Sequence, residues 1–215
     1  EKIGTGSGPE MDIAVDPLEC TENVAKGRAN AISVLAAAPK GCLLKAPGTY
    51  MDQICVGPKA KGVIDIKKSP KENVKAIAKA LGKKVEDVTV IVLDRPRHEA
   101  LIKDLRASGC RIILIEHGTV SAGVATALEE SGIDIHMGIG GAPEGVITAA
   151  ALKCYGGDMQ GVLKPHNEKF TKQAYDMGIK NLDRVFKIDD LAKGNQCLFA
   201  ATGVSSGPFL KGVNF

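Results

Sequence analysis

The sequence predicts an α/β protein, with an α+β N-terminal part over residues 1–86 and a doubly wound α/β part over residues 87–215. Two observations favour this class. Strand patterns fill the first third of the chain, and strand and helix patterns alternate through the second part. With 44% hydrophobic and 25% charged residues and a formal net charge of +3, the composition is that of a globular protein. A disordered chain is therefore excluded.

In the first part, the apolar pattern predicts a short buried strand over residues 12–16 and a second strand over residues 29–38. Weaker strand patterns at residues 42–44 and 54–56 are separated by the turn Pro47-Gly48. This third of the chain is accordingly expected to be rich in strands.

The segment after residue 68 has the pattern of an amphipathic helix. Ser69 is suited to cap its N-terminus, Pro70 to occupy its first position and Gly82 to end it. Apolar residues at 74, 77, 78 and 81 fall on one face, so the spacing predicts a helix over residues 71–81.

The second part begins with a continuous β-branched run over residues 88–93, typical of a strand buried on both faces of a parallel sheet. Helices and strands then alternate, as expected for a doubly wound sheet. The pattern predicts helices at 96–108, 120–130, 143–154, 168–177 and 188–192, and strands at 110–115, 133–137 and 197–201.

Three loops, 94–98, 116–119 and 138–145, follow predicted strands and should meet at one edge of the sheet, where open α/β sheets bind ligands. The first contains Arg95-Pro96-Arg97, a rigid pair of cations suited to a phosphate, with a solvated turn as the alternative. The second contains His117-Gly118-Thr119.

The third loop combines glycines, which allow a close approach of the backbone to a ligand, with Glu144 in the first turn of a helix. This carboxylate either complements the helix dipole or binds a cation. A dinucleotide-binding reading fits only loosely, because Ala142-Pro143 stand where the third glycine would be. His136, in the strand before, is expected to be a core residue.

The segment Asp16-Pro17-Leu18-Glu19-Cys20-Thr21 ends a strand with two carboxylates three positions apart. Hard oxygen ligands beside the free N–H groups of a helix start predict a site for a metal and a phosphate. An Asp-Pro turn followed by an N-capping Thr21 explains the spacing equally well.

Cysteine spacing indicates reduced thiols rather than disulfides, because no CxxC pair occurs and most cysteines lie in apolar runs. We therefore expect an intracellular, cytoplasmic protein. No apolar stretch approaches the ~20 residues of a membrane span. Cys20, at a predicted helix start, is expected to have a lowered pKa and the highest reactivity. The cysteines are Cys20, Cys42, Cys55, Cys110, Cys154 and Cys197.

Nucleic-acid binding is not expected, because the chain has three tyrosines, five phenylalanines and no tryptophan to interleave with its cations. The lysines between residues 59 and 75 are interpreted as a solvated face. Tyr50 is interpreted as a half-buried anchor.

Three motifs, at residues 16–21 (DPLECT), 95–98 (RPRH) and 140–145 (GGAPEG), together resemble class II fructose-1,6-bisphosphatase, within the lithium-sensitive sugar and inositol phosphatase superfamily. The resemblance runs the whole length and implies a sugar-phosphatase fold of layered sheets and helices. It also implies hydrolysis of the 1-phosphate of fructose 1,6-bisphosphate with Mg²⁺ or Mn²⁺, by a homo-oligomer, either dimer or tetramer.

The resemblance also implies roles for single residues. On the family pattern, Asp16, Glu19 and Glu144 bind metal, and Asp16 and Thr21 are catalytic, with Thr21 helping to position the attacking water. The residues implied to hold the sugar bisphosphate are Glu19, Cys20, Thr21, Tyr50, Arg95, Pro96, Arg97, His117, Gly118, Thr119 and Gly141.

Two positions depart from the family pattern. Cys20 stands where the family has glycine, and a Cβ there either crowds the phosphate or requires a backbone shape that glycine adopts cheaply. His117-Gly118-Thr119 replaces Asp-Gly-Asp. The alternatives are a non-catalytic phosphosugar-binding paralogue, or a phosphatase for sedoheptulose 1,7-bisphosphate or inositol phosphates. Compared with the family, the chain is expected to be truncated at both ends, without an acidic upstream segment.

Overall fold

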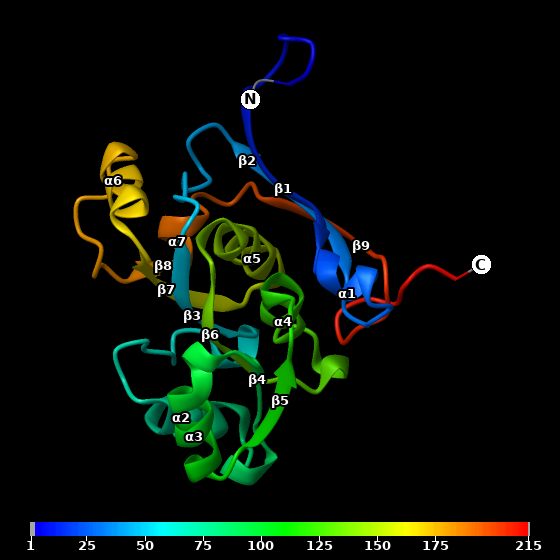
Figure 1. The fold of residues 1–215 in the computed structure, drawn as a ribbon, viewed down its shortest axis with the longest axis vertical. Coiled ribbons are helices and arrows are strands. Elements are labelled where there is room, and N and C mark those ends of the chain that lie inside the picture. The colour runs from blue at the N-terminus through cyan, green and yellow to red at the C-terminus, as the bar shows by residue number, and fades with distance from the viewer. Residues whose placement is uncertain (1–2, 215) are drawn as a thin grey trace.

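Nine strands form two β-sheets in residues 3–214, the part of the chain that the computed structural model describes (Figure 1). The strands are β1 (Met11–Glu19), β2 (Ile32–Pro39), β3 (Tyr50–Val56), β4 (Thr89–Leu93), β5 (Arg111–Ile115), β6 (Ile135–Gly141), β7 (Asp158–Lys164), β8 (Phe186–Lys187) and β9 (Leu198–Gly203). A three-stranded antiparallel sheet has the order β1-β2-β9, and a six-stranded mixed sheet has the order β5-β4-β6-β3-β7-β8.

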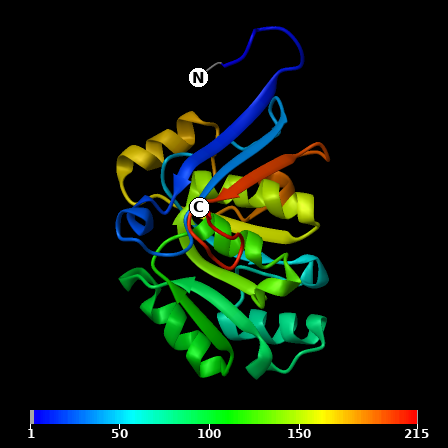
Figure 2. The ribbon, with the colours of Figure 1, turned by 90° about the vertical axis from the view of Figure 1, so that its right-hand side faces the viewer.

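Helices lie between the sheets and on the far face of the larger sheet, so the molecule is layered (Figure 2). This layering confirms the α/β class. The helices are α1 (Thr21–Ala25), α2 (Pro70–Leu81), α3 (Glu99–Ser108), α4 (Thr119–Ala125), α5 (Ala142–Tyr155), α6 (Glu168–Asp176) and α7 (Ile188–Leu191), with short 3₁₀ turns at Pro58–Ala60, Val85–Asp87, Pro96–His98 and Glu129–Ser131.

The central helix α5 contacts strands of both sheets. Its residues from Gly145 to Leu152 are all buried. A helix that is apolar all round is stable only when it is covered on every side, and here the two sheets and α4 cover it. The larger core cluster therefore lies between the sheets, and it contains Val34 of β2, Met51 of β3 and Leu152 of α5.

The three-stranded sheet buries only one face. Ile32 and Val34 of β2 point into the core, whereas Ile13 and Val15 of β1 are exposed on the other face. The prediction of a buried strand at residues 12–16 was thus correct about the strand and wrong about its burial. Every second side chain of β1 is exposed, since no helix or strand of residues 3–214 covers the outer face.

The predicted helix and strand of the middle segment are confirmed. In α2, Ser69 accepts a hydrogen bond from the N–H of Glu72 and its own N–H is bound by the Glu72 carboxylate, while Gly82 ends the helix in the left-handed conformation. The strand β4 is buried along its whole length. The helices α2 and α3 pack on one face of the six-stranded sheet and close the second core cluster.

The expectation of a parallel, doubly wound sheet from residue 87 onward holds for β4, β5 and β6 and not for β7 and β8. Only β4 pairs in parallel, with β5 and β6, whereas β3 inserts antiparallel between β6 and β7. Because β3 comes from residues 1–86 and β9 from residues 87–215, each sheet contains strands from both parts of the chain.

Several element boundaries also differ from the expectation. The glycines predicted to form a loop after residue 137 continue β6 as far as Gly141, and β7 lies in a segment for which no strand was predicted. The helix α4 ends at Ala125 rather than at residue 130. Residues 42–44 contribute a single bridge, from Leu43 to Ala192.

The six cysteines are free thiols, as the sequence predicted. Among the described residues, no helix is long and apolar enough to cross a membrane.

Candidate active site

A cavity of about 630 Å³ lies where the ends of β1, β4, β5 and β6 meet the start of β3. Its walls therefore come from both sheets and from segments far apart in the sequence. The residues that line it are Asp16, Leu18, Glu19, Cys20, Thr21, Tyr50, Leu93, Arg95, Arg97, Glu116, His117, Gly118, Thr119, Gly140, Gly141 and Glu144.

One wall of the cavity is the irregular end of β1. The pairing register with β2 shifts between Asp16 and Glu19, because Pro17 has no N–H to donate to a neighbouring strand. Asp16 Oδ1 accepts a 3.1 Å hydrogen bond from the N–H of Leu18. This is the Asp-Pro turn that the sequence allowed, but the residue that caps α1 is Cys20 rather than Thr21.

Glu19 is 6% exposed, and its carboxylate accepts hydrogen bonds from the N–H groups of Val120 (2.7 Å) and Ser121 (3.3 Å). Burial raises the pKa of Glu19 to about 7 against the effect of these hydrogen bonds, and the nearby charges of Asp16 and Glu144 raise it further. The three carboxylates therefore repel one another across the cavity.

Cys20 has φ 70° and ψ 43°, the left-handed conformation that glycine adopts without strain. Of the two consequences expected for a Cβ at this position, the structure shows the second, a backbone shape that glycine adopts cheaply. The prediction of a lowered pKa is wrong. Burial of the side chain, which is 8% exposed, and the charges of Glu19 and Asp16 raise the pKa of the Cys20 thiol.

The predicted arginine pair lines the same cavity. Arg97 donates from Nε (3.3 Å) and Nη2 (3.0 Å) to the carbonyl oxygen of Ile139, and its guanidinium lies 4.9 Å from the ring centroid of Tyr50. Arg95 Nη2 lies 3.1 Å from His117 Nε2. Both cations are held at the cavity by neighbouring groups rather than solvated freely.

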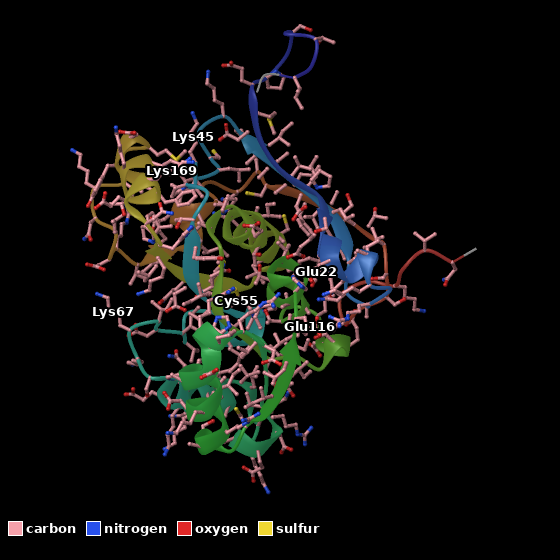
Figure 3. All side chains as sticks on the ribbon, viewed as in Figure 1. Glu22, Lys45, Cys55, Lys67, Glu116 and Lys169 are labelled. Atoms are coloured by element: carbon pink, nitrogen blue, oxygen red, sulfur yellow. The ribbon has the colours of Figure 1, made fainter. Side chains whose placement is uncertain are left out.

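The loop after β5 is tied to α1 and to the segment that follows it. Glu22 Oε2 lies 3.0 Å from His117 Nε2, and Arg28 forms an ion pair with Glu116. Figure 3 labels Glu22 and Glu116 at this junction of α1 with α4. The three-stranded sheet and the larger sheet are therefore linked by charged groups beside the cavity.

The glycines at the end of β6 leave no room for side chains. A Cβ on Gly140 would lie 2.8 Å from the Thr119 side chain, and a Cβ on Gly141 would overlap the carboxylate of Glu144. The carboxylate of Glu144 therefore occupies the space that a side chain at residue 141 would take.

Asp16, Glu19 and Glu144 offer the all-oxygen donors that Mg²⁺ and Mn²⁺ prefer. Burial raises the pKa of Glu19 and the charges of Asp16 and Glu144 raise it further, and a bound cation would favour the ionised form of this carboxylate. Within residues 3–214, however, no three such side chains are gathered closely enough to form a complete metal site. The three carboxylates therefore fit a cation by the type of their donor atoms, but they lie farther apart than the ligands of a formed metal site.

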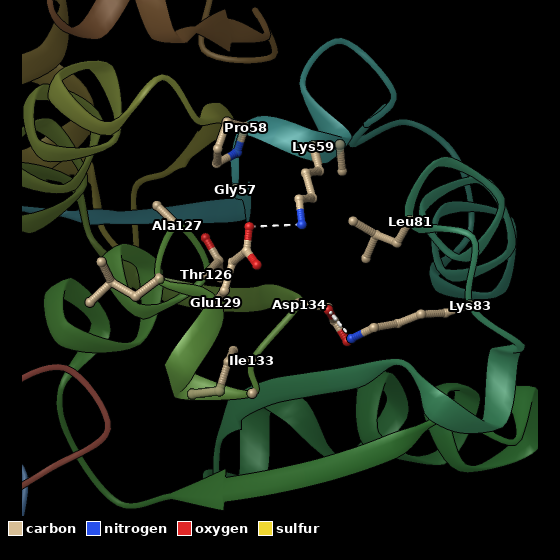
Figure 4. A pocket seen from close by; sticks show the side chains of 13 residues that line it. Gly57, Pro58, Lys59, Leu81, Lys83, Thr126, Ala127, Glu129, Ile133 and Asp134 are labelled. Carbon is tan, nitrogen blue, oxygen red and sulfur yellow. Dashed lines mark hydrogen bonds and ion pairs between the residues drawn. The ribbon is translucent and has the colours of Figure 1, made fainter.

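A second cavity, of about 320 Å³, lies away from this site (Figure 4). Two ion pairs cross it, Lys59 to Glu129 at 2.7 Å and Lys83 to Asp134 at 2.6 Å. The lysines of this cavity are thus paired with its carboxylates. It contains none of the three motifs that line the first cavity.

Comparison with known families decides the relationship. The family model described as bacterial fructose-1,6-bisphosphatase, glpX-encoded, matches residues 1–215. The chain belongs to this family. Fructose-1,6-bisphosphatase 1 class 2 of Escherichia coli K12 is 41% identical over 227 aligned residues, which cover 100% of this chain and 67% of that protein. Fructose-1,6-bisphosphatases class 2 of Escherichia coli O6:H1 and of Shigella flexneri match with the same identity and coverage.

The residues that the resemblance to the bisphosphatase family selected come together in the cavity, with one exception. Pro96 does not line it, and instead takes the first position of the 3₁₀ turn that places Arg95 and Arg97 on either side. Four lining residues were not among those selected, namely Leu18, Leu93, Glu116 and Gly140.

Two buried residues, Asn30 and His98, support the lining without forming it. Asn30 lies outside the three motifs, and His98 ends the RPRH motif but was given no role in the site. Asn30 is buried, and its side chain donates to the carbonyl oxygen of His117 (3.1 Å) and accepts from Ser121 Oγ (2.9 Å). His98 is buried below the arginine pair. The sequence around each residue is polar or mixed, so their burial could not be read from it.

Proposed function

We propose that this chain hydrolyses the 1-phosphate of fructose 1,6-bisphosphate, releasing fructose 6-phosphate and phosphate. The observation that carries the proposal is that one 630 Å³ cavity is lined both by the carboxylates Asp16, Glu19 and Glu144 and by the arginines Arg95 and Arg97. A sugar with phosphates at both ends needs a cation site at the reacting end and fixed cations at the other. The names of the bisphosphatase relatives support the same substrate.

Three carboxylates of the lining would hold Mn²⁺ or Mg²⁺, namely Asp16, Glu19 and Glu144. When bound, the metal stabilises the negative charge of the phosphoryl group and lowers the pKa of the attacking water. Thr21, in the first turn of α1, offers a hydroxyl that orients this water. The Asp16 oxygen that the metal does not use would accept the proton that the water loses.

Arg95 and Arg97, which line the same cavity, bind the phosphate that is not transferred. The planar guanidinium of Arg97 keeps N–H groups in fixed directions because it is held by the Ile139 carbonyl and the Tyr50 ring. Orienting the sugar in this way converts part of the binding energy into correct placement of the reacting phosphate.

Phosphate release from fructose 1,6-bisphosphate tests the proposal, with Mn²⁺, with Mg²⁺ and with a chelator. We expect turnover only with metal, and a fall of about 100-fold or more for Asp16→Asn. The exposed Asp189→Asn, at the far end of an ion pair with Lys153, is the matched control and should retain full activity. No phosphate release with either metal would refute the proposed function, and turnover that persists in the chelator or in Asp16→Asn would refute the roles given to the metal and to Asp16.

A non-catalytic phosphosugar-binding protein is the second candidate, favoured by Cys20 at a left-handed position and by the use of Glu19 to bind the N–H groups of α4. Calorimetry separates the two. Binding of fructose 1,6-bisphosphate without metal and without turnover supports the second candidate. Sedoheptulose 1,7-bisphosphate and inositol phosphates in the same assays test the related substrates.

We also propose that the chain self-associates and acts in the cytoplasm. Support for self-association comes from the open face of the three-stranded sheet, where Met11, Ile13, Val15 and Leu198 are exposed. Sedimentation should show a dimer or tetramer, and Val15→Lys should shift it toward monomer. A wild-type monomer at all concentrations contradicts this proposal. Cell fractionation tests the location.

A further inference from the structure

His98 is almost completely buried, at 1% exposure, directly after the arginine pair. Both nitrogens of its ring meet backbone groups. Nδ1 lies 2.9 Å from the carbonyl oxygen of Leu93, and Nε2 accepts a 2.7 Å hydrogen bond from the N–H of Ile139. Since a carbonyl only accepts and an N–H only donates, the ring is fixed as the neutral tautomer with its proton on Nδ1.

The residue that His98 binds is the residue that holds Arg97. The carbonyl oxygen of Ile139 accepts from Nε and Nη2 of Arg97, while the N–H of Ile139 donates to His98. Gly138 makes room for the ring, because a Cβ at that position would lie 3.0 Å from Nε2. His98, Ile139 and Arg97 thus form one connected chain of contacts that ends at the cavity.

We propose that His98 is a positioning residue for substrate binding, and that its Nε2 holds the Ile139 peptide so that the Ile139 carbonyl fixes the Arg97 guanidinium at the cavity. The proposal rests on the proposed function in one respect, since it takes Arg97 as the group that binds a sugar phosphate. It assigns His98 no contact with the substrate itself.

The charges around His98 support the neutral ring. Burial, together with the Arg97 cation, lowers its pKa, against the opposing effects of the bond to Leu93 and of the Asp52 carboxylate on β3. The other titratable group nearby, His136 on β6, has a pKa that burial also lowers. Protonation of Nε2 would place two N–H groups against each other and break the bond to Ile139.

His136 offers a matched control on the same strand as Ile139. It is fully buried, and its Nδ1 lies 3.2 Å from the carbonyl oxygen of Ile91, as that of His98 does from Leu93. Its Nε2, in contrast, has no hydrogen-bond partner. The two histidines share their packing and differ in whether Nε2 holds a backbone group beside the cavity.

Calorimetric titration with fructose 1,6-bisphosphate, on folded variants, tests the proposal. His98→Asn keeps a donor near Nδ1 and loses the acceptor at Nε2, so its affinity should fall about tenfold. His98→Gln can place an oxygen near Nε2, and should restore most of the affinity. His136→Asn should bind as the wild type does. In the Arg97→Ala background, His98→Asn should have no further effect.

Two further measurements test the neutral ring, and the first of them needs no variant. The ¹⁵N NMR signal of His98 Nε2 should be that of a nitrogen without a proton at pH 7. On acidification below pH 6, the affinity should fall more steeply in the wild type than in His98→Gln. A protonated Nε2 at pH 7, or equal pH dependence of the two proteins, overturns the proposal.

The remaining outcomes separate this proposal from the proposed function. If the wild type binds the bisphosphate without turnover, the proposed function fails and the role of His98 is still decided by the variants. If the wild type is active and His98→Asn binds equally well, or loses as much affinity without Arg97 as with it, the role of His98 fails alone. A wild type that neither binds nor hydrolyses refutes both.

Discussion

The carboxylate of Glu19, at the end of β1, accepts a 2.7 Å hydrogen bond from the N–H of Val120 in α4. A side chain of the three-stranded sheet thereby caps a helix that follows an edge strand of the six-stranded sheet. The same carboxylate lines the cavity. The metal binding that we propose and the contact between the two sheets would therefore depend on one side chain.

Replacing Glu19 by Gln tests this double use. The amide keeps the shape of the side chain and one oxygen acceptor for α4, but it loses the negative charge. We expect the affinity for Mn²⁺, measured by calorimetry, to fall about tenfold or more. Glu10→Gln, near the outer end of β1 and paired there with Lys40, is the control and should bind Mn²⁺ normally. Equal affinities of the two variants would remove Glu19 from the metal site.

Replacing Arg97 by Lys should weaken the binding of fructose 1,6-bisphosphate by about tenfold, because an ammonium group cannot bind the Ile139 carbonyl twice and stack on Tyr50. Titration calorimetry provides the measurement. Arg184→Lys is the matched control, since Arg184 lies 5.1 Å from the ring centroid of Phe186 outside the cavity. If both variants lose affinity alike, the loss does not come from the contacts of Arg97 in the cavity.

Cys20 provides a test of backbone strain. Its φ of 70° costs a residue with a Cβ about 1 kcal/mol relative to glycine. Cys20→Gly and Cys20→Ala both remove the sulfur, but only the first relieves the strain. We expect the free energy of unfolding in urea to be higher for Cys20→Gly than for Cys20→Ala by about 1 kcal/mol. A more stable alanine variant would mean that the strain is absent.

Local signals explain why some of the fold could be predicted. The bounds of α2 follow from Ser69, Pro70 and Gly82, which act on their own helix and need no tertiary partner. The β-branched run of β4 likewise indicates burial by itself. In contrast, Gly138 to Gly141 continue β6 because they pair with β3, a partner more than 80 residues earlier in the chain. Glycines lower strand propensity, so the sequence pattern favoured a loop.

The site divides in the same way. Motifs placed Glu19, Arg97 and Glu144 around one cavity because chemistry-bearing residues follow strand ends. The hydrogen bond from Val120 to Glu19 and the buried ring of His98 depend on the packing of distant segments. The raised pKa of Cys20 was missed for the same reason, since burial and two neighbouring carboxylates outweigh the helix start.

Gly141→Ala should separate activity from stability. The new Cβ would overlap the end of the Glu144 side chain, which is flexible and can move away. We therefore expect a free energy of unfolding within about 1 kcal/mol of the wild type, with a clear loss of phosphate release. Gly48→Ala is the control, because its Cβ would meet Phe170 at an ordinary 3.4 Å. An active Gly141→Ala protein would contradict a role for Glu144 in the reaction.

His136 should make the fold sensitive to acid. Burial lowers its pKa from 6.5 to about 4. Between these values the unfolded chain binds a proton that the folded chain does not, so acid favours unfolding. The stability gained from the neutral ring is complete above pH 6.5 and is lost as the pH falls to 4, by up to about 3 kcal/mol.

The variant His136→Asn removes this titration. Its free energy of unfolding at pH 7 should be lower, because the amide fills the buried site poorly, yet it should fall less steeply than that of the wild type between pH 6.5 and 4. Urea unfolding at several pH values measures both slopes. His98, whose pKa is also lowered by burial, remains in the variant and keeps part of the acid sensitivity. Identical slopes would show that His136 is protonated equally in the folded and unfolded chains.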